Sequence, residues 1–556
     1  MNSVTSKDLR KTAMRTARPY VPSSNSRASR PRSNLLRNFI FIALAIPFLN
    51  GIFRGEAAIV NATNCSFAAV SAAVTSALPG DTVQLPAGTN VWTQTVNLSG
   101  ISLRGAGTNQ TIIIDEVSRA NNGGQLFMLT GNPAHLTELS NLQLLGGTTT
   151  SYNYFGTVVC TGTPSTSWRV DHILFNGLYS KNIVTYGNAF NVIDHNTFLM
   201  RAIAIEDNGY IQNDDTGDQS YALPPTYGLD SSNALYIEDN YFTNIVGAPA
   251  GVSDGEVGAR VVFRHNTVWN EFFANHGCET GGRWRSERSF EVYNNTFTFS
   301  PSAPGYPYYT MANIRGGSGV IYSNTANGYV SIFGMRNFRS TDAYNGQWYP
   351  FGGANGTNPW DSNSPTLYLS GKSTGPNGAG YLQVSGAHWT NNQWYAYTLV
   401  NTNSGWFSVV NSNSADTMYF LGAGLVQSHA PMTFNTGDGF KLYLVYATLD
   451  QPGRGSGDLL RDNGMDASNN EVVINTATGK ASWPDEVLEP IYFWSNTLNG
   501  ANAEASSSYP NIKAGRDFYN DTPKPGYVPY RYPHPLAVAS QPPGRPAPPV
   551  NLKTGP

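Results

Sequence analysis

Residues 193–198 read Ile193-Asp194-His195-Asn196-Thr197-Phe198, and this pattern decides the fold. An apolar residue precedes two polar residues, an asparagine in most copies, a variable residue and a second apolar residue. The pattern returns at residues 170–175, 237–242, 263–268, 292–297, 321–325 and 493–498. Successive copies lie 23 to 29 residues apart, except for two longer steps of 44 and 172 residues. A period in the twenties, with short apolar segments and polar turns, predicts a solenoid and here a parallel β-helix.

Stacking of successive coils explains why the same positions repeat. A single coil does not bury its own apolar face, so equivalent residues contact those of the coils above and below. The first apolar position is expected to fill the bore, and the last to form a second inner stack. These columns are Val170, Ile193, Ile237, Phe263, Val292 and Ile321, and then Phe175, Phe198, Phe242, Val268 and Phe297. The asparagines are expected to form a ladder of side-chain amides that satisfies polar groups buried at the turn.

The chain of 556 residues is long enough for one solenoid with an additional module. Helical spacing in residues 66–77 predicts a cap at the first coil. Residues 389–400 alternate like an antiparallel strand, and the solenoid pattern returns at 491–498, which indicates an insertion. The predicted segments are 1–57 for targeting, 58–365 for the β-helix with its cap, 366–450 for the inserted β-rich module, 451–536 for the final coil and C-terminal cap, and 537–556 for a Pro-rich tail.

The first 57 residues are predicted to direct export. They hold ten Lys or Arg and two Asp or Glu, and an apolar run at 39–48 precedes small residues near Ala58. The alternative is an anchor that stays in the membrane. Because the apolar run is short for a span and Pro47 interrupts it, cleavage is favoured. We therefore expect bacterial-type export to the extracellular space or cell surface, without stable membrane insertion.

Removal of this basic segment leaves an acidic protein. The whole chain has a net charge of −3 and residues 1–57 contribute +8, so the remainder carries −11. Such a surface excludes nucleic acid as a partner, because a nucleic-acid binder needs a basic stripe against phosphate. It also repels an anionic polysaccharide unless a cation bridges the two. Cys65, Cys160 and Cys278 allow at most one disulfide, and the pairing and the oligomeric state stay open.

The positions beside the bore form the first candidate site. Because side chains alternate along a strand, the residue after the first apolar position should point outward. This column reads Asp171, Asp194, Glu238, Arg264, Tyr293 and Tyr322. Its three carboxylates, about 4.8 Å apart from coil to coil, are expected to form an exposed strip that holds calcium, which prefers oxygen ligands. The alternative is a row of solvated carboxylates, with Arg264 paired to Glu238.

The loop of residues 276–288 is the second candidate site. In a lyase, a base removes the proton α to a carboxylate while cations neutralise the developing charge. Catalytic roles are therefore assigned to Arg264, His276, Arg283 and Arg285, and substrate-binding roles to Glu279, Trp284 and Arg288. The alternative is a structural loop held by Arg–Glu pairs. The acidic segment 207–218 is either another calcium loop or a solvated turn.

Two further motifs lie near the predicted cap. Residues 80–88 read Gly-Asp-Thr-Val-Gln-Leu-Pro-Ala-Gly, and residues 102–107 read Ser-Leu-Arg-Gly-Ala-Gly. With the asparagine-bearing coils, they resemble the pectate-lyase-like superfamily of secreted right-handed parallel β-helix proteins over roughly residues 65–345 and 485–536. Residues 449–460 and 517–536 are similar to uncharacterised bacterial secreted β-helix proteins. The resemblance implies the fold but brings no catalytic residue, because the superfamily holds lyases, hydrolases, esterases and non-catalytic fibres.

Together these features predict an all-β protein, a right-handed parallel β-helix with a small inserted antiparallel β module. The expected function is that of a secreted carbohydrate-active protein that cleaves extracellular polysaccharide in the manner of pectate lyases, with calcium as a possible cofactor. Two alternatives stay open. One is a non-catalytic glycan-binding or surface structural β-helix, and the other is a glycoside hydrolase that uses two stacked carboxylates.

Overall fold

The computed structural model describes residues 57–119, 124–148, 156–209, 231–232, 234–247, 249–256, 258–275, 287–300, 310–335, 367–394, 397–405, 407–420, 432–444, 451–456, 474–475, 480–481, 487–507 and 512–539. Apart from Ala57, the described residues belong to the compact unit Ala58–Pro556. Its described residues contain two helices, α2 (Phe67–Ser76) and α3 (Pro535–Ala539), and many short strands. Neither helix is long and apolar enough to cross a membrane.

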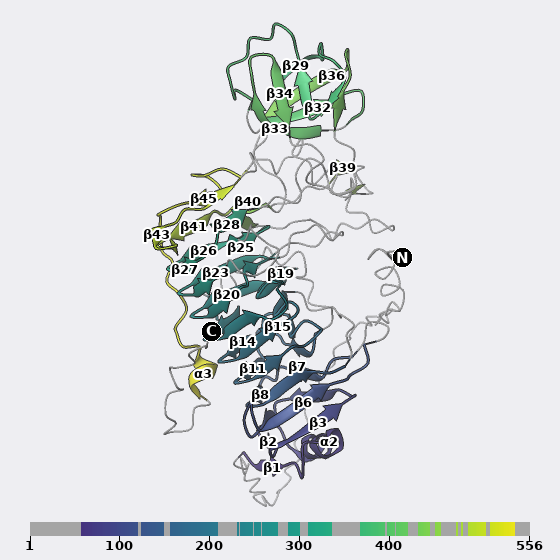
Figure 1. Ribbon diagram of the computed structural model, residues 1–556, viewed down its shortest axis with the longest axis vertical. Helices are drawn as coiled ribbons and strands as arrows, with labels where there is room; N and C mark the ends of the chain where they lie inside the picture. The colour runs from purple at the N-terminus through teal and green to yellow at the C-terminus, as the bar shows by residue number, and fades with distance from the viewer. Residues whose placement is uncertain are drawn as a thin grey trace, which may run out of the picture. The chain divides into compact units, whose positions relative to one another are not determined.

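Sheet 1 forms one side of the solenoid, and its strands stack coil by coil (Figure 1). Its order is β1 (Ile59–Asn61), β2 (Thr82–Gln84), β5 (Ser102–Arg104), β8 (Thr137–Ser140), β11 (Ser167–Asp171), β14 (Phe190–Asp194), β17 (Leu235–Glu238), β20 (Arg260–Arg264), β23 (Ser289–Tyr293), β26 (Ser318–Tyr322), β41 (Ile491–Trp494) and β45 (Phe518–Tyr519). All neighbours are parallel. Strand β41 pairs with β26 although residues 323–490 separate them in the chain, so the solenoid resumes after the insertion.

Sheet 2 follows sheet 1 in each coil after a short turn. Its order is β3 (Gly88–Trp92), β6 (Thr111–Asp115), β9 (Gln143–Gly146), β12 (Leu174–Asn176), β15 (Thr197–Met200), β18 (Tyr241–Asn244), β21 (Thr267–Trp269), β24 (Thr296–Thr298), β27 (Thr325–Asn327), β42 (Thr497–Leu498) and β43 (Ala501–Asn502). Only the last pair, β42 and β43, is antiparallel within this sheet. The solenoid therefore ends on a hairpin, which closes the edge of sheet 2.

Sheet 3 completes the coil. Its order is β19 (Ser253–Glu256), β16 (Ile205–Asn208), β13 (Ile183–Tyr186), β10 (Val158–Thr161), β7 (Phe127–Thr130) and β4 (Val96–Ser99). A bridge between Gly255 and Asn275 links it to sheet 4, which contains β22 (Phe273–Ala274), β25 (Thr310–Ile314), β28 (Ser331–Met335) and β44 (Ser506–Ser507). The described chain thus returns to the same three sides in each coil, which confirms the right-handed parallel β-helix.

Register and burial confirm both apolar columns. Val170, Ile193, Ile237 and Phe263 pair in sequence across sheet 1 and are fully buried. In the second column, the rings of Phe175 and Phe198 stack with centroids 4.6 Å apart. One continuous core therefore runs through the coils, and each aromatic ring adds stacking contacts to the area that it buries.

The asparagine ladder is present as predicted. Asn240 Nδ2 donates to Asn266 Oδ1 at 3.1 Å, and Asn266 Nδ2 donates to Asn295 Oδ1 at 3.2 Å. Asn240 Oδ1 also accepts the backbone N–H of Asn196 at 2.9 Å. The residue before each asparagine has a left-handed backbone, for example φ 55° at His195. Asn, Asp and His tolerate this conformation better than most residues, which explains the polar pair in the repeated pattern.

Residues 367–444 contain an antiparallel module. Its main sheet has the order β29 (Leu367–Lys372), β36 (Gly439–Leu444), β32 (Tyr397–Asn401), β33 (Phe407–Asn413), β34 (Thr417–Phe420) and β31 (Tyr381–Gln383). The module also contains the small pair β30 (Gly378–Ala379) with β35 (Thr433–Phe434). Two further small antiparallel pairs follow the module in the chain, β37 (Arg454–Ser456) with β40 (Val487–Leu488) and β38 (Ile474–Asn475) with β39 (Lys480–Ala481). The module has a core of its own, including Leu382, Leu399 and Leu442. The predicted inserted antiparallel module is confirmed.

The helix predicted in residues 66–77 is α2. Ser66 caps it, because its Oγ accepts the Ala69 N–H at 3.3 Å. Val70 and Ala73 are buried against the core of the first coils. Cys65 and Cys160 are both buried and free, so neither forms a disulfide.

Candidate functional site

The predicted column on sheet 1 is in register but is not an exposed strip. Asp171 pairs with Asp194, Asp194 with Glu238, and Glu238 with Arg264 across successive strands. Their exposed fractions are 4%, 0%, 0% and 0% in chain order. The prediction of an exposed surface here is wrong, although the side chains do point away from the bore.

The cover over this column is the end of the chain. Residues 527–539, called the C-terminal strap below, lie against the outer side of sheet 1. Arg264 donates to the carbonyl oxygens of Tyr530 at 2.8 Å and Arg531 at 3.0 Å. The backbone N–H of His534 donates to Glu238 Oε1 at 2.7 Å. These contacts join residues far apart in the chain, and no repeated sequence pattern predicts them.

Arginines neutralise the buried carboxylates. Arg169 binds both oxygens of Asp194, at 2.7 Å through Nε and 2.6 Å through Nη2. Burial alone would raise the pKa of Asp194, but hydrogen bonds from Arg169 and His195 lower it overall. Arg264 Nη2 lies 2.6 Å from Glu238 Oε2. The Arg264–Glu238 pair that the sequence left as an alternative is thus confirmed.

This arrangement does not fit the predicted calcium site at Asp171, Asp194 and Glu238. The guanidinium groups of Arg169 and Arg264 occupy the oxygen directions that a calcium ion would need. Within the part of the chain that the structure describes, no three His, Cys, Asp or Glu side chains are grouped to hold a metal ion. The three carboxylates of this column are therefore not assigned to calcium.

Most of the second predicted site lies outside the described residues. These are His276, Glu279, Arg283, Trp284 and Arg285. Arg288 is described, and its Nη1 lies 2.7 Å from Glu489 Oε2. This ion pair joins the start of β23 to the returning segment before β41, as expected for the structural alternative. The substrate-binding role of Arg288 stays a prediction.

Sheet 3 carries a charged outer face that was not predicted from the sequence. Glu206 in β16 and Asp254 in β19 are register partners on adjacent strands. Glu206 points outward because its neighbours Ile205 and Asp207 are buried on the bore side. Burial raises the pKa of Asp207 to about 7, and a hydrogen bond from the Thr185 hydroxyl opposes the shift. Asp207 is therefore an interior acid, while the remainder of the predicted calcium loop, 210–218, is outside the described residues.

Each outward carboxylate has a cationic partner. Lys181 Nζ contacts Glu206 Oε2, and Arg315 Nη2 lies 3.1 Å from Asp254 Oδ1. Arg315 is held in place by Asn275, whose Oδ1 accepts the Arg315 backbone N–H at 2.6 Å. The Arg315 side chain is 17% exposed and that of Asp254 is 10% exposed, so solvent reaches both groups. Two acids and two cations thus meet on one sheet face.

A second outward column continues this face. Tyr186, Asn208 and Glu256 are register partners at the ends of β13, β16 and β19. Asn208 Nδ2 donates to Glu206 Oε1 at 3.3 Å. Burial raises the pKa of Tyr186, and the negative charge of Glu256 adds to the effect. The phenol therefore stays protonated at neutral pH and is a hydrogen-bond donor.

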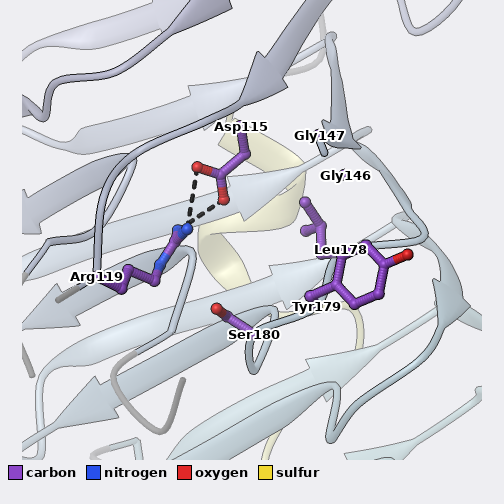
Figure 2. Close-up of a pocket in the computed structure, with 7 residues that line it drawn as sticks. All are labelled: Asp115, Arg119, Gly146, Gly147, Leu178, Tyr179 and Ser180. Atoms are coloured by element: carbon purple, nitrogen blue, oxygen red, sulfur yellow. Dashed lines mark hydrogen bonds and ion pairs between the residues drawn. The ribbon is translucent and has the colours of Figure 1, made fainter. Parts of the chain in front are cut away.

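A small pocket lies where β6 and β9 end and the chain approaches β13 (Figure 2). It is lined by Asp115, Arg119, Gly146, Gly147, Leu178, Tyr179 and Ser180. Arg119 binds both oxygens of Asp115, at 3.2 Å and 2.6 Å. Ser180 directly precedes Lys181, so the pocket adjoins the charged face along the chain. Its hydroxyl, phenol and fixed ion pair are groups that hydrogen-bond to sugar hydroxyls.

Comparison with known proteins adds little beyond the fold. No family model and no curated protein matches the chain. Among solved structures, the ORF18 protein of Geobacillus virus E2 is 12% identical with a TM-score of 0.23, and the match covers 50% of this chain and 57% of that one. A PL6 family alginate lyase is 14% identical with a TM-score of 0.24, covering 50% and 45%. A family 28 exopolygalacturonase of Yersinia enterocolitica is 12% identical with a TM-score of 0.22, covering 50% and 75%. This chain matches only 57% of the length of the viral protein. No functional residue of any of these proteins is assigned to this chain.

Proposed function

We propose that this protein is an exported carbohydrate-active β-helix that acts on extracellular polysaccharide through the outer face of sheet 3. One observation carries the proposal: Glu206 and Asp254 stand side by side on adjacent strands, paired with Lys181 and Arg315. Acid–arginine pairs also occur on sheet 1, where the C-terminal strap covers them, but the Arg315–Asp254 pair of sheet 3 keeps side-chain exposures of 17% and 10%. A guanidinium that solvent reaches is suited to binding the carboxylate of a polysaccharide. We therefore assign the proposed active site to this face of sheet 3 and not to the Asp171–Arg264 column of sheet 1.

Cleavage of a uronate-containing polysaccharide by β-elimination is the chemistry that we assign to it. A base removes the proton α to the sugar carboxylate, the electron pair forms a carbon–carbon double bond, and the bond to the glycosidic oxygen breaks. Arg315 is placed to bind the sugar carboxylate, since a guanidinium matches its geometry. The Glu206 carboxylate accepts the proton, Lys181 stays its cationic partner, and the Tyr186 hydroxyl gives a proton to the leaving oxygen.

A glycoside hydrolase is the second candidate. Register partners on adjacent strands stand about 4.8 Å apart at the backbone. That spacing is close to the roughly 5 Å that separates the two carboxyl groups of retaining glycosidases. Glu206 and Asp254 would then act as the acid and the nucleophile. A non-catalytic glycan-binding protein would use the same face without either reaction.

The test is incubation of the mature protein with separate anionic and neutral polysaccharides. A lyase yields unsaturated ends that absorb in the ultraviolet, whereas a hydrolase yields reducing ends without that absorbance. Arg315→Gln should lower the lyase rate by at least ~10²-fold, as expected for loss of one charge-stabilising group. Arg104→Gln is the matched control, because Arg104 is an ion-paired arginine on sheet 1 with 35% side-chain exposure. No product from any polysaccharide would reject both enzymatic candidates.

A further inference from the structure

From β12 to β27, the outward strand positions of sheet 2 hold no charged residue, unlike those of sheets 1 and 3. Phe175, Phe198, Phe242, Val268 and Phe297 face the bore, so the residues on either side of each face outward. From β12 to β27, the two outward columns read Leu174, Thr197, Tyr241, Thr267, Thr296 and Thr325, and then Asn176, Leu199, Thr243, Trp269, Thr298 and Asn327. Not one of these residues is ionisable at neutral pH, over six successive coils.

The other two faces show that this is not a general property of the solenoid. The outward positions of sheet 1 include Arg169, Asp171 and Arg264, and those of sheet 3 include Glu206 and Asp254. Residues 58–556 also carry a net charge of −11. A partner of sheet 2 therefore gains nothing from ionic attraction, and a charged partner would lose hydration without compensation. The chemistry of this face selects an uncharged partner.

Two aromatic side chains stand out from this face. Trp269 is 41% exposed and Tyr241 is 37% exposed, on the adjacent strands β21 and β18. Trp269 is the register partner of Thr243 and Tyr241 that of Thr267, so the two rings stand diagonally on neighbouring strands. Exposed large rings on neighbouring strands indicate a contact surface. Rings of this kind combine an apolar face with a polar atom, which suits the alternating C–H and hydroxyl surfaces of a sugar.

Threonine hydroxyls extend the surface beyond the rings. Thr267, Thr296 and Thr325 are consecutive register partners, and all three are exposed. Their spacing is set by the strand separation of about 4.8 Å. The hydroxyls therefore form a row along the solenoid axis, and Thr497 of β42 continues it as the register partner of Thr325. Such a row donates and accepts hydrogen bonds at regular intervals.

We propose that the outward face of β12 to β27 docks an uncharged polysaccharide, with sugar rings lying on Trp269 and Tyr241 and hydroxyl groups bonded to the threonine row. This face belongs to a different sheet from the proposed active face. A protein held on a neutral glycan through sheet 2 thus keeps sheet 3 free to act on another polysaccharide. A second copy of the chain is a less suitable occupant, because most of the face consists of hydroxyl and amide groups, which association would have to desolvate.

Binding of the full mature chain to insoluble neutral polysaccharides tests the proposal. Microcrystalline cellulose, chitin and insoluble mannan serve as probes, and the unbound protein is measured across a concentration series. Trp269→Ala should weaken binding at least about tenfold, because it removes a stacking surface. Thr296→Lys should do the same, because it places a charge in the middle of the face. The matched controls are Tyr419→Ala and Thr433→Lys, which change exposed residues of the inserted module and should bind like the wild type.

Four results would overturn the proposal. The first is a wild-type protein that binds none of the three solids, and the second is an equal loss in the control variants. The third is a dimer in sedimentation that Thr296→Lys abolishes, which assigns the face to a second copy. The fourth is ice-crystal shaping that Thr296→Lys abolishes, which assigns the threonine row to ordered water. Cleavage of soluble polysaccharide should be unchanged in Trp269→Ala and Thr296→Lys, so a failure here is separate from a failure of the proposed activity.

Discussion

Replacement of Arg264 by methionine tests whether this buried arginine anchors the C-terminal strap. Arg264 is fully buried, and its guanidinium donates to Glu238, to the Tyr293 hydroxyl at 2.8 Å and to the two strap carbonyls. It also lies 4.8 Å from the centroid of the Tyr236 ring. Methionine keeps much of the volume but donates no hydrogen bond. The substitution therefore leaves the Glu238 carboxylate buried without its cation.

The expected loss of stability is large. Removal of one partner from a buried ion pair typically costs about 3–5 kcal/mol, because an uncompensated charge stays in the interior. Burial already raises the pKa of Glu238, and loss of Arg264 should raise it further, so part of the cost appears as proton uptake. The strap carbonyls lose their donors as well. The free-energy losses at Glu238 and at the strap carbonyls cannot simply be added, because all these groups bind one guanidinium.

Urea unfolding and amide hydrogen exchange measure the two consequences. Arg264→Met should lower the free energy of unfolding by about 3–5 kcal/mol and should abolish exchange protection in residues 527–539. Arg104→Met is the control, because that side chain is 35% exposed and should cost no more than about 1 kcal/mol. The double variant with Glu238→Gln should recover part of the loss, because it removes the buried charge.

An Arg264→Met variant that unfolds within about 1 kcal/mol of the wild type, as expected for a surface ion pair, would show that Arg264 does not anchor the strap. The same conclusion follows if the strap stays protected while the cleavage rate drops at least ~10²-fold, which is the size expected for a charge-stabilising catalytic group. That second outcome would restore the catalytic role that the sequence suggested for Arg264. Failure of the double variant to recover stability would locate the cost in the strap carbonyls instead.

Three other outcomes follow from the fold and its buried groups. Asn266→Ala should destabilise the solenoid by roughly 1–3 kcal/mol, since it breaks the amide ladder. Thr267→Ala on the exposed face should cost far less stability in the same urea titration. Equal losses in the two variants would contradict the assignment of Asn266 to the interior and Thr267 to the surface. Burial raises the pKa of Asp207 to about 7, above its value in the unfolded chain. The unfolded state therefore loses this proton first, and stability should fall as pH rises from about 4 to about 7. Asp207→Asn should weaken that dependence without removing it, because burial also raises the pKa of Glu271 to about 7. An Asp207→Asn variant whose denaturation midpoint falls as steeply as that of the wild type between pH 5 and pH 8 would contradict the assignment. N-terminal sequencing of exported protein should return a start near Ala58, whereas a start at the first methionine would favour a retained anchor.

The stacked columns were predictable from the sequence because they follow from a local and repeated requirement. Each coil must bury one apolar residue, turn through a left-handed residue such as His195, and place an amide at the position of Asn196. The same requirement recurs in every coil, so it leaves a period in the chain. Side-chain alternation then gives the direction of Asp194 as well. For these features the sequence alone was sufficient.

The sites depended on tertiary structure for two physical reasons. Cover over Arg264 comes from residues 530 and 531, and a single contact between distant segments leaves no periodic trace. Glu206 and Asp254 meet because β16 and β19 pair in register, whereas the connections before these strands differ in length, so the sequence does not show which residues face each other. The chain by itself thus determined the coil, its core and its asparagine ladder. Only the folded protein decided which outward residues stay in contact with solvent, because that depends on which distant segment lies over each face.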